Sequence, residues 1–134
     1  MDEVRKITAS DVANCLIDLV VNYRGRAITK KDVQNLLCSI QLEHMNEWNE
    51  IIFDEEIFDS EDGVLIKSIS ENYEDAYGPG TPNPSPSFER VGIFDVLQTE
   101  VILETWDYFK DYSSKELADE ARGARPYVER FRKP

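Results

Sequence analysis

The sequence predicts a mainly α-helical domain with a small β element (α+β), folded as one compact unit over residues 1–134. Apolar residues recur at three- and four-residue spacing through most of the chain, which is the period of an amphipathic helix. Hydrophobic residues make up 41% of the 134 residues and charged residues 31%, a composition typical of a single globular domain. The helical period breaks near 51–59, where a short β hairpin or edge strand is expected.

Residues 8–25 predict the first helix. Thr8 or Ser10 can cap its N-terminus, and Asp11 stands three residues after Thr8, as a capping box requires. Gly25 follows at a position where a left-handed residue commonly ends a helix.

The second helix is predicted over 28–49, with Thr29 as its N-cap. The link between the two helices is short, so we expect them to pack at a sharp angle. His44, the only histidine of the chain, lies on this second helix and is expected to be partly exposed. Helical spacing returns over 63–78, with an apolar side formed by Leu65, Ile66, Ile69 and Tyr73.

An exposed loop is expected at 78–87, because its prolines fix φ and remove backbone donors. The periodic segment 88–112 predicts a core helix, whose apolar face would be Val96, Leu97, Val101, Ile102, Trp106 and Phe109. A last short helix is predicted to begin at Ser113, with Glu116 completing a capping box, and to stop at Gly123. Residues 124–134 would then form a basic C-terminal tail.

The net charge of the chain limits the kinds of partner that it can bind. The chain has 27 acidic and 15 basic residues, which gives a net charge of −12. Such a surface repels nucleic acid and anionic membranes and attracts basic proteins, so a basic protein partner is expected, without direct nucleic-acid or membrane binding. No long apolar run and no signal-peptide pattern is recognisable, which favours a cytoplasmic protein. Cys15 and Cys38 are expected to be reduced thiols near the core.

One acidic region stands out: residues 43–62 contain nine carboxylates and no lysine or arginine. Charge this one-sided favours a basic partner, and a merely solvated edge is the alternative. Trp48 and Phe53 lie inside the region as possible apolar anchors, although Trp48 could equally pack on its own core. The expected partner-binding residues are Glu43, Glu47, Trp48, Glu50, Phe53, Asp54, Glu55, Glu56, Asp59, Glu61 and Asp62.

Neutralising part of this run has two expected effects. Exposed carboxylates act mainly on association with a partner, so their removal should slow binding. Self-repulsion should also fall, so thermal stability is expected to hold or rise. The test set is Asp54, Glu55, Glu56 and Asp59.

The sequence shows no recognisable catalytic set. A zinc site would need Cys and His at close spacing, whereas Cys38 and His44 are separated by six positions. Counted from Asp59, Gly63 comes one position too early for a calcium loop, so loose binding of a hard cation by 54–62 is only an alternative. We therefore expect no enzyme, no cofactor and no metal site, with a metal-binding phage protein as a secondary possibility.

Several motifs resemble the Panacea domain, also called the SocA-like or GepA-like phage-associated domain. They are "ITASDVAN" (7–14), "ITKKDVQNLL" (28–37) and "FDEEI" (53–57). Trp106, residues 113–117 and the pair Pro126–Tyr127 stand where that family has a tryptophan helix, a short helix start and a Pro-Trp pair. The chain departs from the family at 60–66, where Gly63 remains but the family's tryptophan and proline are absent.

The resemblance implies a small, mostly helical domain similar to antitoxins that neutralise a toxin by direct contact. The expected function is thus a non-enzymatic, protein-binding inhibitor in a bacterial host. The alternative is a phage-encoded anti-CRISPR or other anti-defence inhibitor, in which an acidic, nucleic-acid-mimicking face fills the basic groove of a host nuclease.

Overall fold

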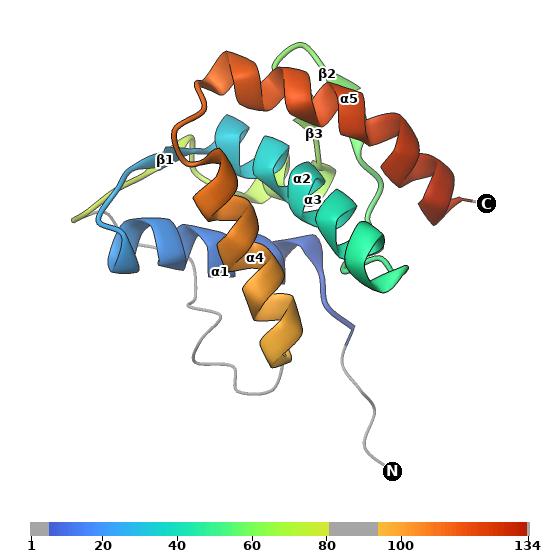
Figure 1. Ribbon diagram of the computed structural model, residues 1–134. Helices are drawn as coiled ribbons and strands as arrows, with labels where there is room; N and C mark the ends of the chain where they lie inside the picture. The colour runs from blue at the N-terminus through green and yellow to red at the C-terminus, as the bar shows by residue number, and fades with distance from the viewer. Residues whose placement is uncertain (1–5, 81–93, 134) are drawn as a thin grey trace.

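The structure is a computed structural model that describes residues 6–80 and 94–133. Its described part confirms a mainly helical fold with a small β element (Figure 1). The central element is α2 (Lys30–Trp48), which contacts α1 (Ala9–Asp18), α4 (Val96–Phe109) and α5 (Ser114–Arg132). In Figure 1, α2 lies between α1 on one side and α5 on the other.

The first helix begins as predicted. The Thr8 hydroxyl accepts a hydrogen bond from the Asp11 N–H at 3.2 Å, and the Thr8 N–H donates to the Asp11 carboxylate at 2.9 Å. The helix changes period after Asp18, where the π-helical turn η1 (Leu19–Tyr23) buries three successive apolar residues. Gly25 then adopts the predicted left-handed conformation, with φ of 66°.

The second helix also begins at its predicted cap, because the Thr29 hydroxyl accepts from the Asp32 N–H at 3.2 Å. It ends at Asn49, which has φ of 53°. Just before α2, strand β1 (Ile28–Thr29) pairs in antiparallel fashion with β4 (Ala76–Tyr77). This two-residue ladder was not predicted from the sequence.

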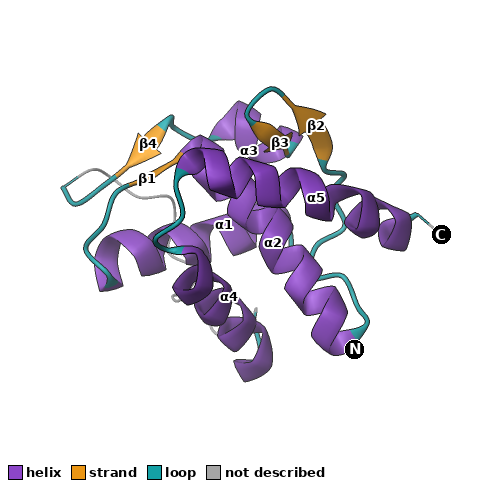
Figure 2. Cartoon of the chain, turned by 45° about the horizontal axis from the view of Figure 1, so that its top comes forward, coloured by secondary structure: helices purple, strands orange, loops and turns teal. Residues whose placement is uncertain are grey.

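The hairpin lies later in the chain than the predicted 51–59 range. Strand β2 (Phe58–Ser60) pairs with β3 (Gly63–Leu65), and both lie at the periphery of the helices, next to α5 (Figure 2). The helix predicted over 63–78 is wrong at both ends, since only α3 (Lys67–Asn72) is helical and Ala76–Tyr77 form β4. The apolar pair Val64 and Ile66 fits a strand as well as a helix, and side chains of α2 stabilise the extended backbone there.

The first turn of α4 differs from its prediction. Asp95 caps the helix in a box with Gln98, but Val96 and Leu97 are 73% and 45% exposed and do not join the core. The predicted core residues from Val101 onward are buried.

The last helix begins at the predicted Ser113–Glu116 capping box but does not stop at Gly123. It continues through Gly123 and Pro126 to Arg132, so most of the predicted basic tail is helical. The three buried residues Ala121, Ala124 and Val128 recur at helical spacing, and the first two lie on either side of Gly123. Their burial offsets the cost of Gly and Pro inside a helix, about 1 and 3 kcal/mol respectively.

The core is a continuous apolar cluster to which α1, α2, α3, α4 and α5 all contribute. Its largest fully buried apolar side chains are Val12, Leu16, Ile17, Leu36, Leu37, Ile40, Phe53, Ile57, Ile66, Ile69 and Ile102. Most of the loop predicted at 78–87 lies outside the described residues. Within the described residues, no helix combines the length and apolarity needed to cross a bilayer.

Candidate functional site

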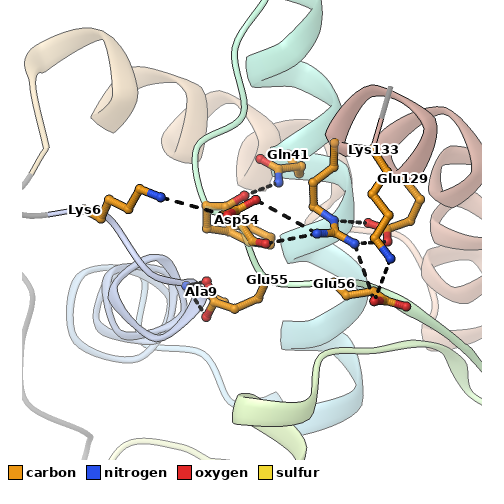
Figure 3. A network of polar contacts seen from close by, with 10 residues as sticks. Lys6, Ala9, Gln41, Asp54, Glu55, Glu56, Glu129 and Lys133 are labelled. Atoms are coloured by element: carbon orange, nitrogen blue, oxygen red, sulfur yellow. Dashed lines mark hydrogen bonds and ion pairs between the residues drawn. The ribbon is translucent and has the colours of Figure 1, made fainter.

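The carboxylates of the acidic segment 54–56 contact other residues of the same chain (Figure 3). Arg132 has a side chain only 10% exposed, and its guanidinium lies 2.9 Å from Glu129, 3.5 Å from Glu56 and 4.0 Å from Asp54. Lys133 also pairs with Glu56, at 3.3 Å. These carboxylates raise the pKa of Arg132, and the hydrogen bonds that its guanidinium donates to Glu129 contribute most. The basic end of α5 thus neutralises much of this segment.

The hairpin part of the acidic region also faces basic residues of the same chain. Lys31 lies 3.4 Å from the Asp62 carboxylate. The Arg122 guanidinium donates to the backbone carbonyl of Glu61 at 2.6 Å. Asp59 is exposed on β2. Within the run from 54 to 62, the carboxylates of Asp54, Glu56 and Asp62 are therefore paired with basic residues of the same chain, whereas Asp59 and Glu61 have no ion pair among the described residues.

Polar side chains of α2 hold the segment that leads into and through the hairpin. Gln41 is fully buried, accepts from the Ile52 N–H and donates to the Phe53 carbonyl, both at 2.7 Å. Asn35 accepts from the Val64 N–H and donates to the Asp62 carbonyl, both at 3.0 Å. These amides replace the pairing that a neighbouring strand would provide.

The same set of contacts corrects two predictions. Phe53 is 1% exposed and belongs to the core, so it is not a surface anchor. Its backbone is held by Gln41, which turns the ring inward although acidic residues follow it. His44 is buried rather than partly exposed, and its Nδ1 lies 2.7 Å from the Glu50 carbonyl oxygen. This imidazole therefore fixes the chain after α2.

A different part of the acidic region opens onto a groove of about 420 Å³ between α2, α4 and α5. Four glutamates line it: Glu43 and Glu47 from α2, Glu104 from α4 and Glu120 from α5. Glu43 is half-buried and the other three are exposed. Among the described residues, none of the four has an ion-pair partner within 4.0 Å, and no lysine or arginine lines the groove.

The groove combines these charges with an apolar floor. Its remaining lining residues are Ser39, Leu42, Val101, Thr105, Tyr108, Phe109 and Ala124. Tyr108 is 70% exposed, and its ring packs edge-on against Phe109 with 4.7 Å between centroids. Hydrogen bonding to Tyr108 raises the pKa of Tyr112, and the Glu120 and Glu116 carboxylates raise it further.

The remaining predicted residues lie beside a second, smaller hollow of about 130 Å³. Trp48 and Glu50 line it together with His44, Asp95, Leu97 and Gln98. Trp48 is 41% exposed, so its indole forms part of the surface rather than of the core. The structure thus separates the predicted site residues: some line the groove, some line this hollow, and most of the rest make contacts within the chain.

Neither cysteine has the environment of a nucleophile. Burial raises the pKa of both the Cys15 and Cys38 thiols to about 12, whereas reactive cysteines have lowered values. Cys38 instead donates weakly to the Ala121 carbonyl, at 3.6 Å. Among the described residues, no three His, Cys, Asp or Glu side chains come close enough to share a metal ion.

Comparison with known proteins identified no relative: no family model, curated protein or solved structure matches this chain. The resemblance to the Panacea domain therefore stays a prediction. The geometry itself defines a helical domain with an acid-walled groove.

Sequence reasoning missed several groove residues. Glu104, Tyr108 and Glu120 lie far along the chain from residues 43–62, and their carboxylates and ring reach the groove only because α4 and α5 pack on α2. The available indication was that Glu43 and Glu47 stand one helical turn apart, on one side of α2.

Proposed function

We propose that this chain is a non-enzymatic inhibitor that binds a basic protein, in the manner of an antitoxin that neutralises a toxin by direct contact. It would act in the cytoplasm of a bacterial host. The observation that carries the proposal is the groove between α2, α4 and α5, where Glu43, Glu47, Glu104 and Glu120 surround an apolar floor and have no basic partner among the described residues. Charged residues around an apolar centre are the usual composition of a protein interface.

The location of the groove separates the binding acids from the structural ones. Arg132 and Lys133 already lie on Asp54 and Glu56, so a basic partner would have to displace them. A partner that approaches the groove displaces no ion pair of the described residues. Its basic side chains would meet uncompensated carboxylates, which speeds association and selects against acidic partners.

A phage-encoded anti-defence inhibitor is the second candidate, and the net charge of −12 favours it. A basic nuclease groove attracts any strongly acidic domain. A nucleic-acid mimic, however, requires carboxylates in place of phosphates over an extended surface. The apolar floor under the four glutamates has no counterpart in a phosphate backbone, which favours a protein segment as the occupant.

The test is growth rescue. The neighbouring gene product would be expressed in a sensitive host with the wild-type chain, with Glu104→Gln/Glu120→Gln, or with Glu100→Gln/Glu74→Gln. The last pair removes the same charge from exposed positions outside the groove that have no ion pair among the described residues. We expect the wild type and this control to restore growth and the groove variant to fail.

Two other outcomes decide between the candidates. Absence of rescue by the wild-type chain, combined with protection of DNA from a host defence nuclease, would support the anti-defence inhibitor instead. Rescue that is equal for all three chains would contradict the groove as the binding face.

A further inference from the structure

We infer that the groove binds a cationic peptide segment in which apolar side chains stand between basic ones. This inference rests on the proposed function and specifies the chemistry of the partner. The segment's Lys or Arg side chains would meet the glutamates of the rim, and an apolar side chain would contact the floor formed by Leu42, Val101, Phe109 and Ala124.

The rim carboxylates favour several separate cations over one compact ion. They come from three helices, with Glu43 and Glu47 on α2, Glu104 on α4 and Glu120 on α5. No three acidic, histidine or cysteine side chains of the described chain are grouped closely enough to bind one metal ion. Positive charges spaced along a peptide match carboxylates that are distributed in this way.

The floor adds the apolar requirement. A volume of about 420 Å³ is within the range of about 300–1,000 Å³ found for binding pockets. It is large enough for one or two apolar side chains but not for a folded domain, so the partner would insert a segment. A purely polar cation would make no apolar contact with the side chains of the floor.

Ser39 supplies an independent indication of a ligand. Its residue is 5% exposed and lines the groove, yet its hydroxyl has no hydrogen-bond partner among the described residues. The hydroxyl of Thr105, also in the groove, is already satisfied by the Val101 carbonyl at 2.7 Å. The hydroxyl oxygen keeps some accessible surface, since Asp32 Oδ1 is the one fully buried side-chain oxygen or nitrogen of the described residues without a partner, and this surface is on the groove side. A backbone group of a bound segment, its carbonyl or its N–H, would satisfy Ser39.

The experiment titrates the chain into fluorescently labelled peptides and follows anisotropy. One peptide alternates Lys and Leu, a second contains only Lys at the same charge, and spermine serves as a non-peptide competitor. We expect the Lys/Leu peptide to bind at least about tenfold more tightly than the Lys peptide, because only the former covers the floor. Spermine should displace it poorly. Equal affinity for both peptides, or efficient displacement by spermine, would overturn the inference.

Variants locate the binding. Glu104→Gln/Glu120→Gln should weaken the Lys/Leu peptide by about two- to fivefold per carboxylate, and Glu100→Gln/Glu74→Gln should leave it unchanged. Ser39→Ala should weaken it by about two- to tenfold, while the thermal midpoint of the chain holds or rises. Unchanged affinity in both groove variants would overturn the inference.

This inference and the proposed function can fail separately. Groove-dependent peptide binding without growth rescue would contradict the antitoxin-like function and leave the peptide site standing. Growth rescue without groove-dependent peptide binding would contradict the peptide site alone.

Discussion

Both carboxylate oxygens of Glu55 accept hydrogen bonds from the backbone N–H of Ala9, at 2.9 and 3.1 Å. Ala9 is the first residue of α1, and negative charge at a helix N-terminus is stabilising because it offsets the unsatisfied N–H groups and the helix dipole. A residue that the sequence assigned to partner binding therefore caps a helix that lies 46 positions away.

The Glu55 contact predicts a loss of stability when this single carboxylate is neutralised. Glu55→Gln should lower the free energy of unfolding by about 1–2 kcal/mol, because it removes the charge from the helix terminus. The sequence alone predicts unchanged or higher stability when Asp54, Glu55, Glu56 and Asp59 are neutralised together, because self-repulsion falls. Urea denaturation would measure the change, with Glu61→Gln in the exposed hairpin turn as the control. Equal stability of the two variants would show that the Glu55–Ala9 contact contributes nothing.

Gln41→Leu should be strongly destabilising. The substitution keeps the bulk of the side chain but leaves the Ile52 N–H and the Phe53 carbonyl buried without partners. We expect a loss of about 2–4 kcal/mol from two unsatisfied groups. Asn46→Leu, at an exposed position of the same helix, controls for the introduced leucine. A loss below that of the control would mean that the 52–53 backbone finds other partners.

Gly63→Ala tests the close approach of the hairpin to α2. At this position φ is 116°, and a Cβ would lie 2.3 Å from the Asn35 side-chain oxygen. Gly25→Ala is the matched control, since its φ is also positive, at 66°, but no atom lies within 4 Å of the added Cβ. Thermal denaturation should show a loss of about 1 kcal/mol for the control and a clearly larger loss for Gly63→Ala. Equal losses would mean that strain in φ, not the contact with Asn35, requires the glycine.

The two cysteine thiols should be unreactive in the folded chain. Because burial raises their pKa to about 12 from 9.0, Cys15 and Cys38 stay protonated in the native state at pH 8. A disulfide reagent should therefore label them only after denaturant is added. The unfolded chain loses these protons above about pH 9, so stability should fall as the pH rises past that value. Rapid labelling of the native chain would contradict the buried environment of both residues.

Features that depend on near neighbours in the sequence, such as helix caps, could be predicted from the sequence. Features that depend on the packing of distant helices could not. The caps at Thr8, Thr29 and Ser113 depend on neighbours three residues away, so the helix starts were confirmed. Gly123 gave a false stop, because burial of α5 against α2 overrides the local preference for ending a helix there.

For the candidate site as well, the sequence predicted the residues but not how they are arranged in space. Nine carboxylates at 43–62 were visible as a run, but which of them are compensated depends on α5, whose Arg122 and Arg132 are 60 or more positions away in sequence. Glu104 and Glu120 could not be joined to Glu43 and Glu47 without the packing of three helices.

An NMR titration of the isotope-labelled chain with the Lys/Leu peptide distinguishes the groove from residues 54–62 as the binding site. We expect the largest amide shift changes around the groove, in Ser39–Glu47 of α2, in 101–109 of α4 and in 120–124 of α5, and we expect them to decrease at high salt because the ionic contacts are screened. Shift changes centred on residues 54–62 instead would show that the peptide displaces the basic end of α5, and would contradict the groove as the binding site.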